Sequence, residues 1–202
     1  MMTQIRFPLA RFFRISLKGW LILAVCACIL APPAAWYYAH HIATERLRVR
    51  HVCIEGLDGL RILQVSDIHY NGDPRRMNRL VRAINRQEVD LVCFTGDLVS
   101  DGALFPAALA ELQAIRHLVY GVLGNHDYGS GREPSQLDRA LRETGGRLLK
   151  NESVRIAPDL FLVGLDEASI GDPDPTRALQ GVGDARHILL FHEPIMVEGL
   201  QD

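Results

Sequence analysis

Cysteine is scarce in this sequence, and its spacing matches no metal-binding or redox motif. Only 4 cysteines occur in 202 residues, and neither Cys53 nor Cys93 has a CxxC partner. This spacing excludes a zinc knuckle and a dithiol redox motif. A disulfide between Cys53 and Cys93 stays open for a domain outside the cytoplasm. The apolar run around Cys93 instead favours two buried thiols.

The sequence also lacks a basic excess over most of its length, and it has no internal repeat or low-complexity tract. The net charge is −2, and residues 1–44 hold four basic and no acidic side chains, which leaves −6 for residues 45–202. Nucleic acids are bound largely through positive charge and counterion release, so this balance argues against them as obligate partners. Residues 45–202 are numerous enough for one domain with its own core.

Charge is missing entirely from residues 19–39, an apolar run near the N-terminus. A helix over this run would span about 30 Å at ~1.5 Å per residue, which matches the hydrocarbon core of a bilayer. Trp20 at one end and Trp36 at the other are placed as interfacial aromatic residues. Residues 19–39 therefore predict a single transmembrane anchor.

The basic residues 1–18 predict the orientation of this anchor. Positive charge before the run favours a cytoplasmic N-terminus, which places the later domain on the extracytoplasmic side of the inner membrane. A cleaved signal peptide is the alternative, because residues 20–31 form a short apolar core and Pro32-Pro33 would end a helix there. Residues 40–56 are expected to form a connector and a first strand.

From residue 57 onward, short apolar runs alternate with amphipathic segments. Apolar side chains at helical spacing predict helices over residues 74–86, 106–115 and 134–144, with a shorter one near residues 176–179. Apolar runs typical of strands occupy residues 61–66, 90–95, 117–123, 147–150, 153–156, 160–165 and 188–191. This alternation predicts one α/β domain over residues 57–202, with a largely parallel sheet.

Polar side chains follow the ends of four of these expected strands. The sequences are Ser66-Asp67-Ile68-His69, Gly96-Asp97, Gly124-Asn125-His126-Asp127 and His192-Glu193-Pro194. Ligands bind beyond the carboxyl ends of strands in such sheets, so we expect these side chains to meet at one rim. Their carboxylate, imidazole and amide groups suit divalent metal ions, and no thiolate competes. Each motif alone is common in turns, but their order and spacing together favour a metal site.

In this order, the four motifs resemble those of the calcineurin-like metallophosphoesterases, from residue 57 to the C-terminus. Residues 57–69 and 161–167 are most similar to the membrane-linked bacterial branch, whose members have been linked to lipid or lipid-A-precursor phosphoesters. The resemblance implies a layered α/β/β/α sandwich that hydrolyses a phosphoester, on a lipid-linked or nucleotide-sugar-lipid substrate. A phosphodiesterase for soluble nucleotides is the alternative.

The resemblance also implies a centre of two divalent metal ions and a role in it for each motif residue. The implied ligands are Asp67 and His69 for the first ion, Asn125 and His192 for the second, and Asp97 as the bridge between them. A hydroxide shared by the two ions would attack the phosphorus. His126 would face the phosphate, where it stabilises charge or protonates the leaving oxygen. The ligand types fit manganese, iron, zinc or nickel equally well.

The sequence departs from the family pattern at two places. The Gly-His-x-His motif, which gives each metal one further ligand, is missing after His192. We therefore expect a sandwich that is incomplete at the C-terminus, its second sheet coming largely from later sequence. A non-catalytic, membrane-anchored remnant is the rival interpretation. Relatives often place an aspartate three positions after the bridging one to orient the catalytic histidine, where this chain has Ser100 and then Asp101. Asp166-Glu167 also closes a strand, and we interpret this pair as structural.

Overall fold

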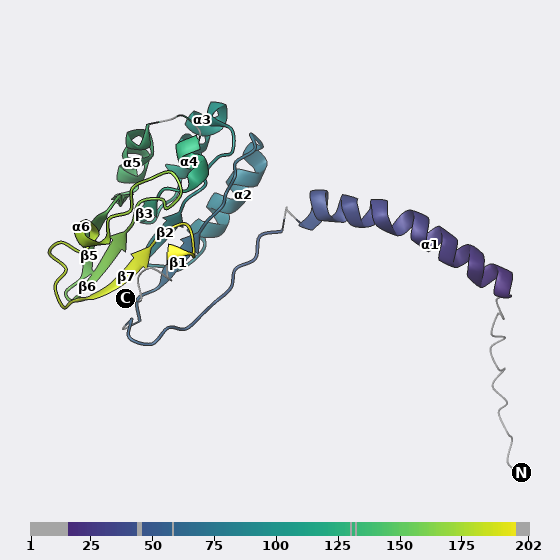
Figure 1. The fold of residues 1–202 in the computed structure, drawn as a ribbon, viewed down its shortest axis with the longest axis horizontal. Coiled ribbons are helices and arrows are strands. Elements are labelled where there is room, and N and C mark those ends of the chain that lie inside the picture. The colour runs from purple at the N-terminus through teal and green to yellow at the C-terminus, as the bar shows by residue number, and fades with distance from the viewer. Residues whose placement is uncertain (1–15, 44–45, 58, 130, 132, 197–202) are drawn as a thin grey trace, which may run out of the picture. The chain divides into compact units, whose positions relative to one another are not determined.

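The chain forms two compact units, Met1–Arg50 and His51–Asp202 (Figure 1). The computed structural model describes residues 16–43, 46–57, 59–129, 131 and 133–196. The first unit contains the helix α1, Leu17–Tyr37, followed by a π-helix, Tyr38–Ala43.

The helix α1 overlaps the apolar run expected over residues 19–39 and begins two residues earlier. It begins after Ser16, whose hydroxyl accepts a hydrogen bond from the N–H of Gly19. It continues through Pro32 and Pro33, where the signal-peptide alternative places a helix end. By length and composition, its 21 residues could cross a membrane, so α1 is a candidate membrane span.

Four parallel strands in the order β1-β2-β3-β4 form the first sheet of the second unit. They are β1 (Ile62–Val65), β2 (Leu91–Thr95), β3 (Val119–Val122) and β4 (Arg147–Leu148). The connecting helices are α2 (Pro74–Asn85), α3 (Phe105–Leu112) and α5 (Pro134–Glu143). A helix between consecutive parallel strands returns the chain to the starting end of the sheet, as the alternation in the sequence predicts.

The connecting helices bury their apolar faces against one face of this sheet. The buried side chains include Met77, Val81, Leu112 and Leu141 of the helices and Val92 and Phe94 of β2. The residues at the start of α2 determine where this helix begins. Asp73 caps the helix by accepting the N–H of Arg75 at 2.9 Å, and Pro74 follows at the first helical position. Every residue of β2 is buried, which fits its apolar run from Leu91 to Phe94.

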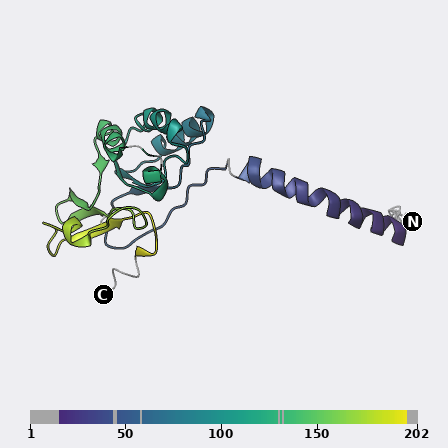
Figure 2. The same cartoon turned by 45° about the horizontal axis from the view of Figure 1, so that its top comes forward.

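A second sheet covers the other face of the first one. It consists of β5 (Glu152–Ala157), β6 (Leu160–Gly164) and β7 (Arg186–Leu190), with β5 antiparallel and β7 parallel to β6. The buried residues between the sheets are Leu91, Cys93, Val122, Leu149, Leu162 and Leu190. Figure 2 shows these green and yellow strands on the side away from the teal helices. Three strands of this sheet come from residues 152–190, where the sequence predicts apolar strands.

The outer face of the second sheet is covered as well. Phe161, Val163 and Leu165 pack with Ala178 and Val182, in and after the short helix α6 (Pro175–Ala178). The layers are therefore helices, sheet, sheet and a short helix. This order confirms the α/β architecture that the sequence predicts.

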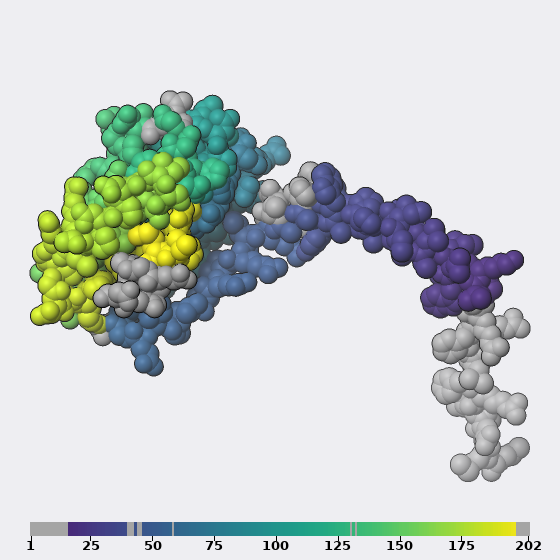
Figure 3. Space-filling view, viewed as in Figure 1, coloured from purple at the N-terminus to yellow at the C-terminus, as the bar shows by residue number. Residues whose placement is uncertain are grey.

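Residues 46–57 form no strand, which corrects the first strand expected within residues 40–56. A strand needs a neighbour for its backbone N–H and C=O groups, and neither sheet of the described residues includes this segment. Val52 and Ile54 are consequently exposed. Arg186 at the start of β7 donates a hydrogen bond to the carbonyl of Gly56. Within the second unit, the blue residues that lead to β1 lie at its surface (Figure 3).

Three local expectations differ from the structure. Burial raises the pKa of the Cys93 thiol to about 12, but Cys53 lies in the exposed segment, so only one of these two free thiols is buried. The helix expected over residues 106–115 ends at Leu112 and is continued by turns. A helix, α4 (Asn125–Gly129), forms where the sequence showed only a polar motif.

Candidate metal centre

The loops after β1 and β2 carry three candidate ligands in the left-handed backbone region. The φ angle is 52° at Asp67, 43° at His69 and 62° at Asp97. Such angles are uncommon for residues other than glycine, and they cluster at functional sites. Backbone hydrogen bonds join the two loops, since the N–H of Asp67 donates to Gly96 and that of His69 to Asp97. These sharp turns bring the three side chains to one rim of the sheet.

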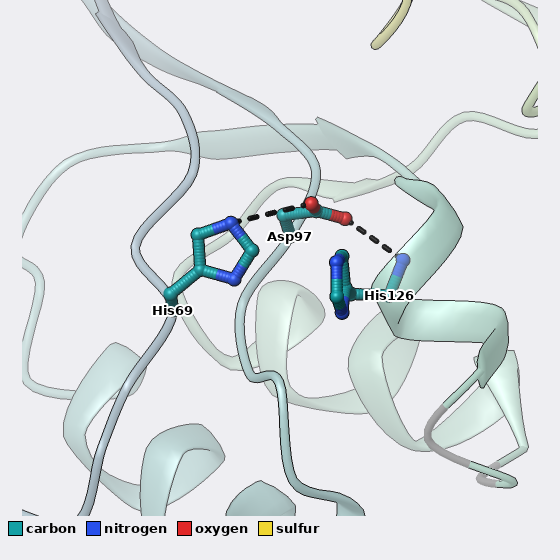
Figure 4. Close-up of side chains that lie close together, drawn as sticks. All are labelled: His69, Asp97 and His126. Carbon is teal, nitrogen blue, oxygen red and sulfur yellow. Dashed lines mark hydrogen bonds and ion pairs between the residues drawn. The ribbon is translucent and has the colours of Figure 1, made fainter.

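Asp97 is shared by two groups of side chains that have metal-ligand chemistry. His69, Asp97 and His126 form one group, and Asp67, Asp97 and His192 form the other, with ligand atoms within 4.8 Å of one another in each. Oδ2 of Asp97 is 3.5 Å from Nε2 of His69 and 3.6 Å from Nε2 of His192. Figure 4 shows His69 and His126 on either side of Asp97. The Asp97 side chain is only 4% exposed, so both histidines face a carboxylate that water hardly reaches.

The two imidazoles that face Asp97 each have their other nitrogen engaged. Nδ1 of His192 is 2.7 Å from the carbonyl oxygen of Thr95, and Nδ1 of His69 is 2.8 Å from the hydroxyl of Ser100. A carbonyl oxygen can only accept, so in neutral His192 the proton stays on Nδ1 and Nε2 keeps its lone pair. Metal-binding histidines usually show this arrangement. The donor set therefore fits a divalent metal ion.

The charge around His192 also favours a cation. Burial opposes protonation of its imidazole, but the hydrogen bond with Thr95 and the charges of Asp97 and Asp67 outweigh burial and raise its pKa. The same negative surroundings attract a metal ion, which competes with the proton for Nε2.

Glycine is required at two positions where the loops approach the candidate ligands. A Cβ atom on Gly124 would lie 2.2 Å from Oδ1 of Asp97, and one on Gly96 would lie 2.8 Å from Nδ1 of His192. Gly96 also has a φ of 91°, which residues with a side chain rarely adopt. The glycines of the Gly-Asp and Gly-Asn-His-Asp motifs thus allow the close approach on which the site depends.

His126 and Asn125 begin α4 and lie at the same rim. The N–H of His126 donates to Oδ1 of Asp97 at 3.0 Å, and its ring stands edge-on to that of His69, with centroids 4.9 Å apart. Asn125 sits between His126 and Gly124, both of which approach Asp97. The structure therefore brings the expected segment together with the loops after β1 and β2, and it places His126 within reach of the ligand atoms.

The position at which relatives often carry an orienting aspartate has a different contact here. The Ser100 hydroxyl meets His69, not His126. The neighbouring Asp101 accepts the N–H of Ala103 and so caps a short 3-10 helix, Gly102–Leu104. Ser100 therefore orients a candidate metal ligand, and the orienting group expected for His126 is not at this position.

Asp127 is a carboxylate of the site to which sequence reasoning gave no role. It is buried, and it accepts the N–H groups of Asp97, Leu98 and Gly124, each at 2.9 Å. Burial raises its pKa, although the three N–H donors act in the opposite direction. Asp127 thus fixes the backbone of Asp97 against α4. In the sequence, the position of Asp127 at the end of the Gly-Asn-His-Asp motif was the feature that indicated a role for it.

A layered sandwich with carboxylates and imidazoles at the strand ends defines a class of metal-dependent phosphoesterases, and comparison with known families agrees. The sequence model of the calcineurin-like phosphoesterase family matches residues 60–194, and the chain belongs to this family. It is therefore a metallophosphoesterase, a hydrolase of phosphoric esters. Every predicted site residue lies within the matched range.

Individual relatives come from bacteria and animals. The uncharacterized metallophosphoesterase YkoQ of Bacillus subtilis is 28% identical over 197 residues, covering 90% of this chain and 72% of YkoQ. The UDP-2,3-diacylglucosamine pyrophosphatase LpxG of Chlamydia trachomatis is 27% identical, covering 90% of this chain and 73% of LpxG. A transmembrane protein with metallophosphoesterase domain from Bos taurus is 32% identical, covering 69% of this chain and 36% of that protein.

A solved structure shares the fold. TT1561 of Thermus thermophilus has a TM-score of 0.50 and 20% identity, and the similarity covers 66% of this chain and 68% of TT1561. At this identity the similarity concerns the fold alone.

Proposed function

We propose that the chain hydrolyses a phosphoester at a centre of two divalent metal ions. The observation that carries this proposal is Asp97, which belongs to both groups of candidate ligands. Within these groups Asp67 lies with His192 and His69 with His126, so the division of the ligands between two ions follows the family resemblance. The first ion would be held by Asp67 and His69, whose Oδ1 and Nε2 atoms are 3.8 Å apart. Asn125 and His192 would hold the second ion, and Asp97 would contact both.

The residues of the chain would act on the substrate in distinct ways. When bound, the metal ions supply positive charge and an activated water for attack on phosphorus. Asp97 offers a carboxylate in a buried position, and His69 and His192 turn Nε2 towards it while their Nδ1 atoms contact Ser100 and Thr95. His126, held by its backbone at Asp97, would donate a hydrogen bond or a proton to a phosphate oxygen.

A lipid-linked phosphoester is the substrate class that the relatives and α1 support best. LpxG is named for a diacylated sugar nucleotide, and α1 could hold the domain at a membrane. We infer an inner-membrane anchor with a cytoplasmic N-terminus and an extracytoplasmic domain, from the basic residues that precede α1. A soluble nucleotide phosphoester is the second candidate substrate.

The full chain, purified in detergent and stripped of metal, tests these proposals. Manganese, iron, zinc and nickel are restored one at a time, and hydrolysis of an aryl phosphodiester, a UDP-linked diacyl sugar and a soluble UDP-sugar is compared. We expect two ions per chain, metal-dependent hydrolysis and the highest kcat/KM for the diacylated substrate. Bound metal without hydrolysis would favour the non-catalytic remnant. A higher kcat/KM for the soluble UDP-sugar would overturn the lipid assignment.

A further inference from the structure

Asp166 and Glu167, which follow β6, are deeply buried yet belong to neither group of candidate metal ligands. Their exposed fractions are 2% and 1%. Carboxylates are almost never buried to this extent unless they are paired, because burial removes their hydration. The partners of these two side chains therefore show what the pair does.

Asp166 is joined to the helix that carries His126. The hydroxyl of Tyr128, in α4, donates to Oδ1 of Asp166 at 2.6 Å. The ammonium group of Lys150 lies 3.3 Å from Oδ2 of Asp166 and 5.1 Å from the centre of the Tyr128 ring. Tyr128 is thus held by its hydroxyl and by its ring, two residues after His126.

Asn151 fixes Asp166 from the other side. Oδ1 of Asn151 accepts the N–H groups of Asp166 and Asp174, both at 3.0 Å, and its amide group donates to the carbonyl of Asp172 at 2.6 Å. Asn151 is buried and adopts a φ of 53°. The loop of residues 166–174 is therefore bound at both of its ends.

Glu167 connects this loop to the segment that carries His192. Its carboxylate accepts the N–H of Ser169 at 2.9 Å and that of Ile170 at 2.5 Å. The Ser169 hydroxyl in turn donates to Oε1 of Glu193 at 2.5 Å. Glu193 directly follows His192, so the loop reaches a second histidine of the site.

The tight turn of this loop allows little change. A Cβ atom on Gly171 would lie 2.5 Å from the carbonyl oxygen of Glu167 and 2.8 Å from Oδ2 of Asp166. Burial and then the hydrogen bond to Asp166 raise the pKa of Tyr128, which keeps its hydroxyl a donor. Burial opposes ionisation of Glu167, but the N–H groups of Ser169 and Ile170 prevail and lower its pKa. The Tyr128 hydroxyl thus stays a donor to Asp166, and the Glu167 carboxylate stays an acceptor of the loop N–H groups.

We propose that Asp166 and Glu167 are positioning residues that hold two histidines of the candidate metal centre, His126 and His192, in place. One arm runs through Tyr128 to α4 and His126, and the other through Ser169 and Glu193 to His192. This inference rests on the proposed function, and it goes beyond it by assigning each arm a separate effect. Loss of the first arm should slow turnover, whereas loss of the second should weaken metal binding.

Two substitutions that each remove a single hydroxyl test the arms in the full chain in detergent. Tyr128→Phe should lower kcat for the aryl phosphodiester roughly 10- to 100-fold, the usual effect of removing a group that supports a ligand or catalytic residue. Ser169→Ala should weaken zinc affinity, measured by competition with a chromophoric chelator, by roughly 10-fold. Tyr120→Phe in β3 and Ser135→Ala in α5 lie outside the loop and serve as matched controls, with Tm recorded for all four variants.

A double substitution separates positioning from general destabilisation. In a His126→Ala background, Tyr128→Phe should cause no further fall in kcat, because the residue through which it acts is gone. An equal fall in both backgrounds, or a Tyr128→Phe variant as active as Tyr120→Phe, would overturn the first arm. Zinc affinity of Ser169→Ala equal to that of Ser135→Ala would overturn the second. Because zinc affinity is measured without turnover, the second arm is tested even if the unsubstituted chain hydrolyses nothing, a result that would count against the proposed function alone.

Discussion

Asp97 combines deep burial with contacts to His69 and His192, so its replacement should affect both of the proposed metal ions at once. Asp97→Asn keeps the size of the side chain but puts a neutral amide in place of the carboxylate. We expect metal content and activity to fall together. The measurement is metal stoichiometry of the full chain beside hydrolysis of an aryl phosphodiester.

His126→Ala is the informative comparison for Asp97→Asn. We expect metal content to stay nearly unchanged while turnover falls roughly 10²- to 10⁴-fold, the usual scale for a lost acid or charge stabiliser. The ligand atoms of His126, Asp97 and His69 lie within 4.8 Å of one another. The alternative is therefore that His126 is itself a metal ligand. Equal metal loss in both variants would make His126 a ligand, and full activity would remove it from the mechanism.

Gly124→Ala tests the close approach to Asp97. The new Cβ atom would lie 2.2 Å from Oδ1 of Asp97, so the carboxylate must move, and we expect weaker metal binding. Gly129→Ala is a matched control, because a Cβ atom there meets nothing within 4 Å. Chelator competition and Tm should be measured for both variants. Unchanged metal affinity in Gly124→Ala would contradict the geometry described for Asp97.

The candidate ligands could be chosen from the sequence because strand ends of a parallel sheet meet at one edge. Asp67, His69 and Asp97 all lie where this rule puts them. The same rule cannot tell a carboxylate that faces a metal from one that faces the backbone. Asp127, which binds three N–H groups, could not be distinguished in this way, nor could the contact of Ser100 with His69.

At the level of elements, α2 depends on a cap that the sequence already shows. Asp73 accepts the N–H of Arg75, and the buried residues Met77 and Val81 follow on the inner face of the helix. Asp73→Ala should lower the free energy of unfolding by about 0.5–2 kcal/mol. Chemical denaturation of the full chain measures this change, with Asp73→Asn as the control that retains a capping oxygen. A loss of equal size in both variants would show that the cap contributes little.

Elements with a clear period were predictable, and those decided by distant partners were not. The helices α2 and α5 follow their apolar spacing, and β2 follows its continuous apolar run. The short helix α4 depends on Asp127 binding N–H groups far along the chain, which no local pattern contains. Residues 46–57 have apolar side chains suited to a strand, yet a strand exists only where a neighbour completes its hydrogen bonds.

For the whole molecule, α1 makes attachment to a membrane testable. We expect the protein to stay in the membrane pellet after alkaline washing and to retain residues 1–18, because α1 continues through Pro32 and Pro33. The intact mass of the natural protein and its fractionation are the measurements. A mature chain that starts after α1 and is found in the soluble fraction would establish the signal-peptide alternative.

At Asp67, His69 and Asp97, the left-handed backbone lowers the stability of the fold, whereas the proposed hydrolysis requires their side chains. Residues held in such conformations cost on the order of 1–3 kcal/mol each, and glycine would relieve much of that cost. Under selection for a stable chain alone, these three positions should drift towards glycine or asparagine. Under selection for hydrolysis they should keep their aspartate and histidine side chains and tolerate the strain. Mutational libraries sorted separately for expression and for turnover should therefore diverge most sharply at these three positions.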